Sequence, residues 1–211
     1  MTPELSREAM RQLDQLGVEV RVNTKVSEIN EIGIRAGNDF IETETILWAA
    51  GVAANPLNKT LDSELDRQGR VIVTSNLSIP NYSNIFVIGD QAHYKWGTNN
   101  MPLPGLAPVA MQQGRFVAKV IKKIAARQVP PTIFQYVDKG QMATIGKRKA
   151  ITEYKSLRLH GFIAWLAWFF IHILYLVGFK NKLFVFTQWV WSYLFSKRGA
   201  RLITERGWKL K

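Results

Sequence analysis

The sequence contains no cysteine. Disulfide bonds, thiolate metal ligands and dithiol redox centres are therefore excluded. The three histidines, His93, His160 and His172, show no metal-ligand spacing such as H-E-x-x-H, and no cluster of acidic residues accompanies them. We therefore expect no metal site.

The sequence also lacks a G-x-G-x-x-G turn, the glycine pattern that lets a backbone approach a pyrophosphate at a helix N-terminus. Nothing at the amino end resembles a signal peptide, and no internal repeat is apparent. Any dinucleotide bound by this chain would therefore need its phosphate-binding turn from elsewhere.

Acidic residues are scarce in the last third of the chain. Residues 1–138 hold 14 Lys plus Arg against 14 Asp plus Glu, whereas residues 139–211 hold 14 against 2. Five of the seven tryptophans lie in this basic part too. Cationic charge interleaved with Trp suits an anionic bilayer surface or a nucleic acid.

Periodicity and turn residues predict alternating helices and strands. Helices are expected over residues 3–16, opened by Thr2-Pro3-Glu4 and ended by Gly17, and over residues 108–126. Strands are expected over residues 18–22, 25–29, 33–36, 39–52, 69–73, 84–90, 134–137 and 142–146. This order predicts an α/β fold, in which ligands bind at the carboxyl ends of strands.

NIFVIGD, residues 84–90, places Asp90 at the end of a strand that is expected to be buried on both faces. A carboxylate at such a position can accept two hydrogen bonds from a pair of sugar hydroxyls. The alternative is that Gly-Asp merely ends a strand and caps a turn.

Four motifs in order resolve this choice by resemblance. TSNLSIPNYSNIFVIGDQA resembles the second FAD fingerprint of flavoproteins with two dinucleotide-binding domains, and LWAAGV resembles the segment that leads back into their FAD domain. LPGLAPVAMQQGRFVA and YVDKGQMATIG resemble type II NADH:quinone oxidoreductases in particular. Because the glycine turns are absent, the resemblance implies the carboxyl-terminal half of such an enzyme, with the Rossmann-like α/β fold of these flavoproteins.

The resemblance implies hydride transfer from NADH to FAD, followed by reduction of a quinone. It implies that Gly89 and Asp90 contact FAD, with Asp90 on the ribityl chain, and that Ala50 and Gly51 pass close to the nicotinamide. For Ala50 and Gly51 the alternative is a tight turn. The start of the helix near Pro108, with Ala107 and Val109, would face the flavin with its positive dipole end. These positions form the expected cofactor site.

The quinone-side residues implied by the resemblance are Met111, Gln112, Gln113 and Lys139, with Gln112 and Lys139 in catalytic roles. The family's Ala-Gln-x-Ala pattern is broken by Pro108, which removes one N–H donor and one amide. The alternatives are two solvated helix glutamines and one more surface lysine.

Residues 161–179 form a run of 19 residues without formal charge, and residues 183–195 form a second apolar run. The first would span about 28 Å as a helix, close to a hydrocarbon core. However, basic residues flank both of its ends, which disfavours a single span. We expect two in-plane amphipathic helices with their aromatic face, including Trp165 and Trp168, toward the membrane. A transmembrane span and a buried core helix are the alternatives.

The expected domains are the end of an NADH domain (1–52), the second part of an FAD domain (53–128), a β-rich segment near the quinone (129–157) and membrane-anchoring helices (158–211). The expected partners are quinone, a lipid surface at the cytoplasmic face of the inner (plasma) membrane, and either a second copy or the missing amino-terminal half. A non-catalytic membrane anchor is the alternative function. A nucleic-acid binder is disfavoured because a long apolar run interrupts the basic residues.

Overall fold

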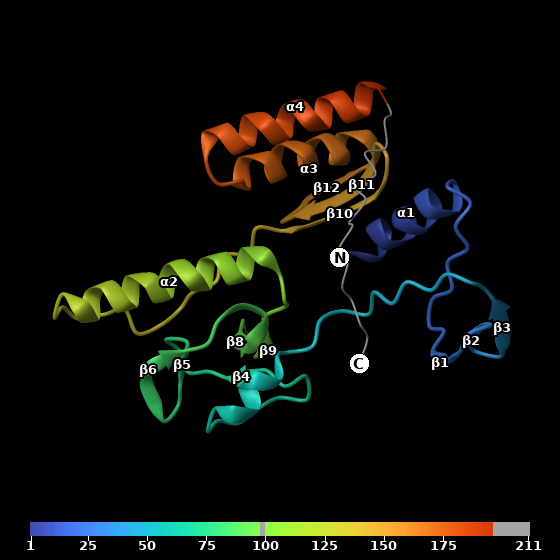
Figure 1. The fold of residues 1–211 in the computed structure, drawn as a ribbon. Helices are drawn as coiled ribbons and strands as arrows, with labels where there is room; N and C mark the ends of the chain where they lie inside the picture. Colours follow the sequence, from blue (N-terminus) through green and yellow to red (C-terminus); the bar gives the residue numbers. More distant parts are fainter. Residues whose placement is uncertain (98–99, 196–211) are drawn as a thin grey trace, which may run out of the picture. The chain divides into compact units, whose positions relative to one another are not determined.

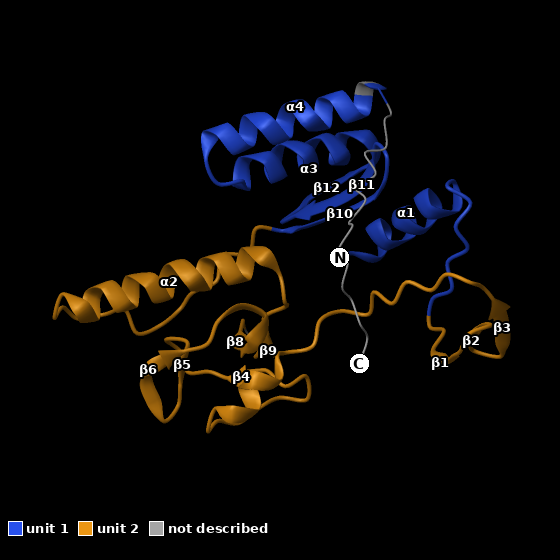
Figure 2. Cartoon of the chain, in the orientation of Figure 1, with its two compact units in different colours: residues 1–22, 140–211 blue, residues 23–139 orange. Residues whose placement is uncertain are grey.

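The structure is a computed structural model that describes residues 1–97 and 100–195. It is a mixed α/β chain divided into two compact units, coloured separately in Figure 2. Unit 1 comprises Met1–Val22 and Gly140–Lys211, and unit 2 comprises Asn23–Lys139. The domain boundaries expected from the sequence divide the chain by function and not by compactness, and they stay predictions.

Unit 1 is built on a three-stranded antiparallel sheet in the order β10, β11, β12. Helices α1 and α3 both contact its central strand, and α4 packs beside α3 (Figure 1). The bounds are α1 Pro3–Asp14, β10 Gln141–Gly146, β11 Lys149–Tyr154, β12 Leu157–His160, α3 Gly161–Tyr175 and α4 Phe179–Phe195.

Helices α3 and α4 form an antiparallel hairpin held together by aromatic rings. Trp168 stacks on Trp189 with ring centroids 5.3 Å apart, and Trp165 meets Tyr193 at 4.5 Å. These rings therefore face the partner helix, so the expectation that Trp165 and Trp168 face a membrane is wrong. Burial against α4 outweighs the amphipathic pattern that their spacing suggested.

The apolar run of residues 161–179 is not one continuous helix. It breaks after Tyr175, and Gly178 adopts a left-handed φ of +81° before α4 begins. Lys182 Nζ donates to the Leu174 carbonyl at 2.8 Å, a cation on the last turn of α3. Within the described residues, no helix is both long and apolar enough to cross a bilayer.

Unit 2 begins with an antiparallel meander, continues through short strand pairs and ends with the long helix α2 and an extended segment. Of the strand pairs formed by the described residues, only β4 and β7 pair in parallel. The bounds are β1 Val26–Ile29, β2 Gly33–Ala36, β3 Asp39–Glu42, η1 Pro56–Thr60, β4 Val71–Ile72, β5 Ser78–Ile79, β6 Tyr82–Phe86, η2 Gly89–Gln91, β7 Ala92–His93, β8 Lys95–Trp96, β9 Met101–Pro102 and α2 Ala107–Ala125.

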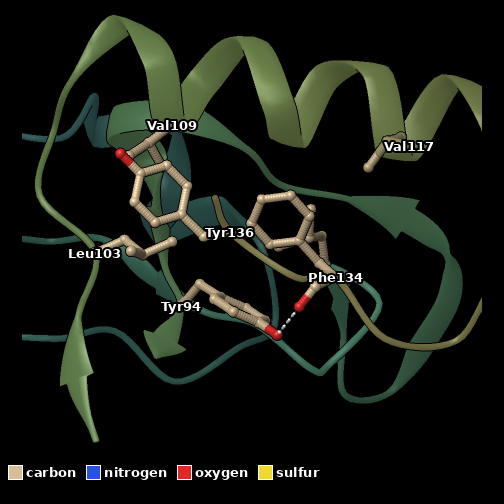
Figure 3. Close-up of a cluster of buried hydrophobic side chains, with 7 residues drawn as sticks. Tyr94, Leu103, Val109, Val117, Phe134 and Tyr136 are labelled. Atoms are coloured by element: carbon tan, nitrogen blue, oxygen red, sulfur yellow. Dashed lines mark hydrogen bonds between the residues drawn. The ribbon is translucent and has the colours of Figure 1, made fainter. Parts of the chain in front are cut away.

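The main core of unit 2 lies under α2. Val109 and Val117 on the helix pack with Tyr94, Leu103 and Phe134, among others shown in Figure 3. The Tyr94 hydroxyl donates to the Phe134 carbonyl at 2.7 Å inside this core. The contact fixes the segment that follows α2 against the strands that precede it.

Several predicted elements are confirmed and several are wrong. Both predicted early and central helices form, as do the strands at 25–29, 33–36 and 142–146. Residues 18–22 and 134–137 form no strand, and 39–52 is a strand only up to Glu42. Strand β6 ends at Phe86 and exposes Tyr82 to Asn84, so the stretch is not buried on both faces.

Candidate functional site

Asp90 lies in a short turn of 3₁₀-helix, η2, four residues beyond the end of β6. Gly89 before it adopts a left-handed φ of +65°, a conformation that costs other residues strain. The turn redirects the chain from Val87, which is buried, toward β7. Asp90 itself is exposed. The Asp90 carboxylate thus points outward from a turn that follows the buried residue Val87.

A cavity of about 540 Å³ opens beside this turn. Such a volume is within the usual range for sites that hold small molecules or cofactors. Four of the six predicted cofactor-contacting residues line it, and they come from two separate stretches of unit 2. The described residues that line it are Ala50, Gly51, Val52, Ala53, Gln68, Arg70, Gly89, Asp90, Leu103 and Gly105.

Small residues keep this cavity open around the carboxylate. A Cβ added at Gly105 would lie 3.0 Å from Asp90 Oδ1, and Gly51 has a φ of +99°. Among the residues that the structure describes, none donates a hydrogen bond to the Asp90 carboxylate. Both oxygens are therefore able to accept hydrogen bonds from a ligand, and the donor set fits the hydroxyls of a ribityl chain.

Gln113 on helix α2 anchors the Asp90 turn by a hydrogen bond. Its side chain is 1% exposed, and its Oε1 accepts the Gly89 N–H at 2.6 Å. The amide therefore ties helix α2 to the backbone immediately before Asp90. Gln113 does not reach a solvent-facing quinone position in this arrangement, because its side chain is enclosed beneath the turn.

Replacing Gln113 with leucine is expected to lower the free energy of unfolding by about 1–3 kcal/mol, because the partly buried Gly89 N–H would lose its acceptor. Chemical denaturation followed by circular dichroism would measure this loss. Gln112→Leu is the matched control: its partner Val137 is 63% exposed, so water replaces the lost bonds. Equal losses for the two variants would contradict the assignment.

Gln112 makes two hydrogen bonds with one backbone residue. Its Nε2 donates to the Val137 carbonyl and its Oε1 accepts the Val137 N–H, both at 3.0 Å. The side chain therefore holds the segment that leads to Asp138 and Lys139 against α2. Its role as a quinone contact stays a prediction, and the two backbone bonds give it a positioning role as well.

The other predicted residues lie on or after α2. Ala107 is the first residue of the helix and is exposed, Val109 is 3% exposed in the core, and Met111 is half-buried. Lys139 is an exposed residue two positions after Val137. The structure therefore puts Ala107 and Met111 on the helix near the Asp90 turn, while Val109 serves packing.

Sequence reasoning missed six residues of the cavity, among them Arg70, Leu103 and Gly105. In the sequence, neither Gly105 nor Arg70, which directly precedes β4, carries a distinctive signal of a binding site. For Gln113 the sequence did contain a signal of burial, because this residue lies at helical spacing between Val109 and Val117, in the apolar stripe of the helix. A polar residue within such a stripe indicates a buried partner.

Two family models match the chain. One, described as pyridine nucleotide-disulphide oxidoreductase, covers residues 1–114, and the other, the NDH2 C-terminal domain, covers residues 139–198. The first covers more than half of the chain and includes the whole Asp90 turn.

Curated relatives extend the match across nearly the full chain. The type II NADH:quinone oxidoreductases Ndh and NdhA of Mycobacterium tuberculosis are 37% and 36% identical, each over 98% of this chain. The match covers 46% and 45% of their own lengths. The internal alternative NAD(P)H-ubiquinone oxidoreductase A1 of Arabidopsis thaliana is 25% identical over 92% of this chain and 41% of its own. The chain thus spans about half the length of these relatives.

The fold agrees with that of a solved structure. NDH2 from Plasmodium falciparum in complex with NADH superposes with a TM-score of 0.82 at 15% identity, over 95% of this chain and 56% of that one. At this identity the likeness concerns the fold alone. The family model over residues 1–114 shows that the chain belongs to the pyridine nucleotide-disulphide oxidoreductase family, with type II NADH:quinone oxidoreductases among its relatives.

Proposed function

We propose that this chain is the flavin- and quinone-facing part of a membrane-associated enzyme that passes electrons from NADH through FAD to a quinone. The observation that carries the proposal is the Asp90 carboxylate, which projects into the cavity without a protein donor among the described residues. Because a ligand with paired hydroxyls satisfies that carboxylate, the site suits the ribityl chain of a flavin.

When bound, FAD would supply the hydride and electron chemistry, and the protein would supply placement. Asp90 would accept the ribityl hydroxyls, and Gly105 would leave them room. Ala50 and Gly51 would allow a close approach of the nicotinamide. The first turn of α2 would direct its positive dipole end toward the flavin, and within it the Val109 and Ala110 N–H groups donate to the Leu106 carbonyl.

Lys139 is the residue that we assign to the quinone side. It follows the segment that Gln112 fixes to α2, so its backbone has a defined attachment within unit 2. A cation at this place would stabilise negative charge that develops on a reduced quinone. Gln112 and Met111 would border the same region from the helix, whereas Gln113 acts through the Asp90 turn.

The α3–α4 hairpin is the part that we assign to a lipid surface. Many of its exposed positions are apolar: Leu174 is 67% exposed, Phe179 81% and Phe184 65%. Two stripes at helical spacing, residues 163, 170 and 174 on α3 and 184, 191 and 195 on α4, carry exposed apolar side chains. Neither helix is long enough to span, so the hairpin would lie in the plane of the interface.

Basic residues would add attraction to anionic lipid headgroups. Lys180 is exposed at the start of α4. The tail cations Lys197, Arg198 and Arg201, which the sequence assigns to headgroups, lie outside the described residues. We propose the cytoplasmic face of the inner membrane as the location, and the amino-terminal half of the enzyme or a second copy as the protein partner.

The proposed function is tested by purifying the protein that carries this chain together with its dinucleotide-binding turns. The expected result is a visible flavin spectrum and oxidation of NADH that depends on added quinone. A protein with neither bound flavin nor quinone-dependent oxidation would support the alternative, a membrane anchor without catalysis.

Lys139→Met is expected to lower the rate of quinone reduction about 10-fold or more while leaving NADH oxidation by a soluble electron acceptor within about 2-fold, because the lost cation acts only on the quinone side. Steady-state assays with the two acceptors measure the difference. Lys119→Met, an exposed change on α2 with the same loss of charge, is the control. Equal losses with both acceptors would assign Lys139 a structural role.

A further inference from the structure

A largely buried polar cluster includes Arg70, one of the residues that line the cavity. Asp66 and His93, each with a side chain about one-eighth exposed, meet with Oδ2 and Nδ1 2.8 Å apart. The same Oδ2 accepts Arg70 Nε at 2.7 Å. The other carboxylate oxygen accepts the backbone N–H groups of Gln68 and Arg70, both at 2.9 Å. Asp66 therefore organises the whole turn that presents Arg70.

Asp66 carries its negative charge at neutral pH. Burial alone would raise the pKa of this carboxyl, but the hydrogen bonds from His93, Arg70 and Gln68 together hold its pKa well below the ordinary value. The guanidinium of Arg70 thus has a fixed anionic support on its Nε side. An arginine held in this way loses little conformational freedom when it binds a ligand.

The far edge of the guanidinium is available at the cavity. Arg70 lines the cavity. Apart from the Nε bond to Asp66, its guanidinium makes one hydrogen bond to the described residues, a long one of 3.5 Å from Nη1 to the Leu103 carbonyl. A guanidinium carries five N–H donors, so most of them still lack a strong acceptor. This edge has the geometry that binds two oxygens of one phosphate.

The charges of the cavity are divided between two residues. Among the described residues that line it, Arg70 is the only cationic one and Asp90 the only anionic one. A ligand that satisfies both must offer hydroxyl donors to Asp90 and anionic oxygens to Arg70. A polyol chain that ends in a phosphate has this chemistry, whereas a neutral polyol satisfies only Asp90.

We propose that Arg70, positioned by Asp66, binds the phosphate oxygens of the flavin cofactor while Asp90 binds its hydroxyls. This inference rests on the proposed function, because it takes the ligand of the cavity to be a flavin nucleotide. It adds a phosphate contact from this chain, which has no glycine-rich phosphate turn of its own. The cavity then selects the phosphorylated form of the cofactor.

The test compares FAD with riboflavin, which has the same ring and ribityl chain but no phosphate. Apoprotein of the complete enzyme is titrated with each flavin, and binding is followed by quenching of flavin fluorescence. Arg70→Gln is expected to weaken FAD binding about 10- to 100-fold and riboflavin binding less than about 3-fold, because only FAD offers the phosphate. Arg67→Gln, an exposed neighbour with the same loss of charge, should leave both affinities within about 2-fold.

Two further variants separate positioning from folding. Asp66→Asn should weaken FAD binding selectively as well, since Arg70 loses its ionic support, and Arg70→Lys should recover part of the FAD affinity because it keeps the charge. Thermal melting of each apoprotein confirms that it is folded. Equal losses for FAD and riboflavin in folded Arg70→Gln would overturn the inference and leave the proposed function standing. A folded wild-type protein that binds neither flavin would overturn both.

Discussion

Replacing Asp90 with alanine in the complete protein is expected to leave it without retained FAD after gel filtration. The carboxylate projects into the cavity, and no described residue competes for its oxygens. Two hydrogen bonds to a charged group contribute about 1.5–3 kcal/mol each, so their loss weakens binding by roughly two to four orders of magnitude. The flavin-to-protein absorbance ratio measures the effect directly.

Asp62→Ala is the control for this experiment. Asp62 is an exposed acid of the same unit that does not line the cavity, so its loss removes the same charge and leaves the site intact. Stoichiometric flavin in purified Asp90→Ala would refute the role of Asp90. Loss of flavin from both variants would point to a general charge effect.

Changing Leu174 and Phe184 together to serine is expected to weaken binding of the complete protein to liposomes about 100-fold or more. Both side chains are about two-thirds exposed in the hairpin. Their transfer into an apolar environment would contribute about 1.5–3 kcal/mol each, and the double change removes most of that contribution. Co-sedimentation with vesicles of anionic and of neutral lipid measures the affinity.

The matched control changes Ile121 and Ile124 to serine. These residues are about half exposed on α2 in unit 2, so the same chemistry is altered away from the hairpin. Unchanged liposome binding by the hairpin variant would contradict the assignment of this surface to lipid. A transmembrane arrangement would instead resist carbonate extraction in both variants.

Local signals predicted the long elements well. Pro108 and the apolar positions that follow it predicted α2, and the structure begins that helix at Ala107. Strand β11 was missed because Ala150, Ile151 and Thr152 are buried in succession, which removes the alternation by which a half-buried strand is recognised. The alternating residues 18–22 have the pattern of a strand, but strand formation depends on a partner that local sequence does not specify.

The sequence predicted the site residues that belong to a recognisable motif. It did not predict the residues that tertiary packing brings to the cavity. Gly89 and Asp90 were identified in sequence, and they line the cavity with Ala50 and Gly51. Arg70 was not, because its place at the wall results from the turn that Asp66 organises. The aromatic face of α3 was assigned to the wrong environment, since helical spacing shows which residues share a face and not what covers it.

The paired bonds between Gln112 and Val137 have a consequence for which side chains this position tolerates. A primary amide offers a carbonyl oxygen and an NH2 group in one plane, so one of its N–H donors and its oxygen together substitute for one rung of a β-ladder between a helix and an extended chain. Glutamate can supply only the acceptor half at neutral pH, and asparagine is one methylene shorter. The position therefore discriminates among polar residues by stereochemistry, and not by charge or hydrophobicity.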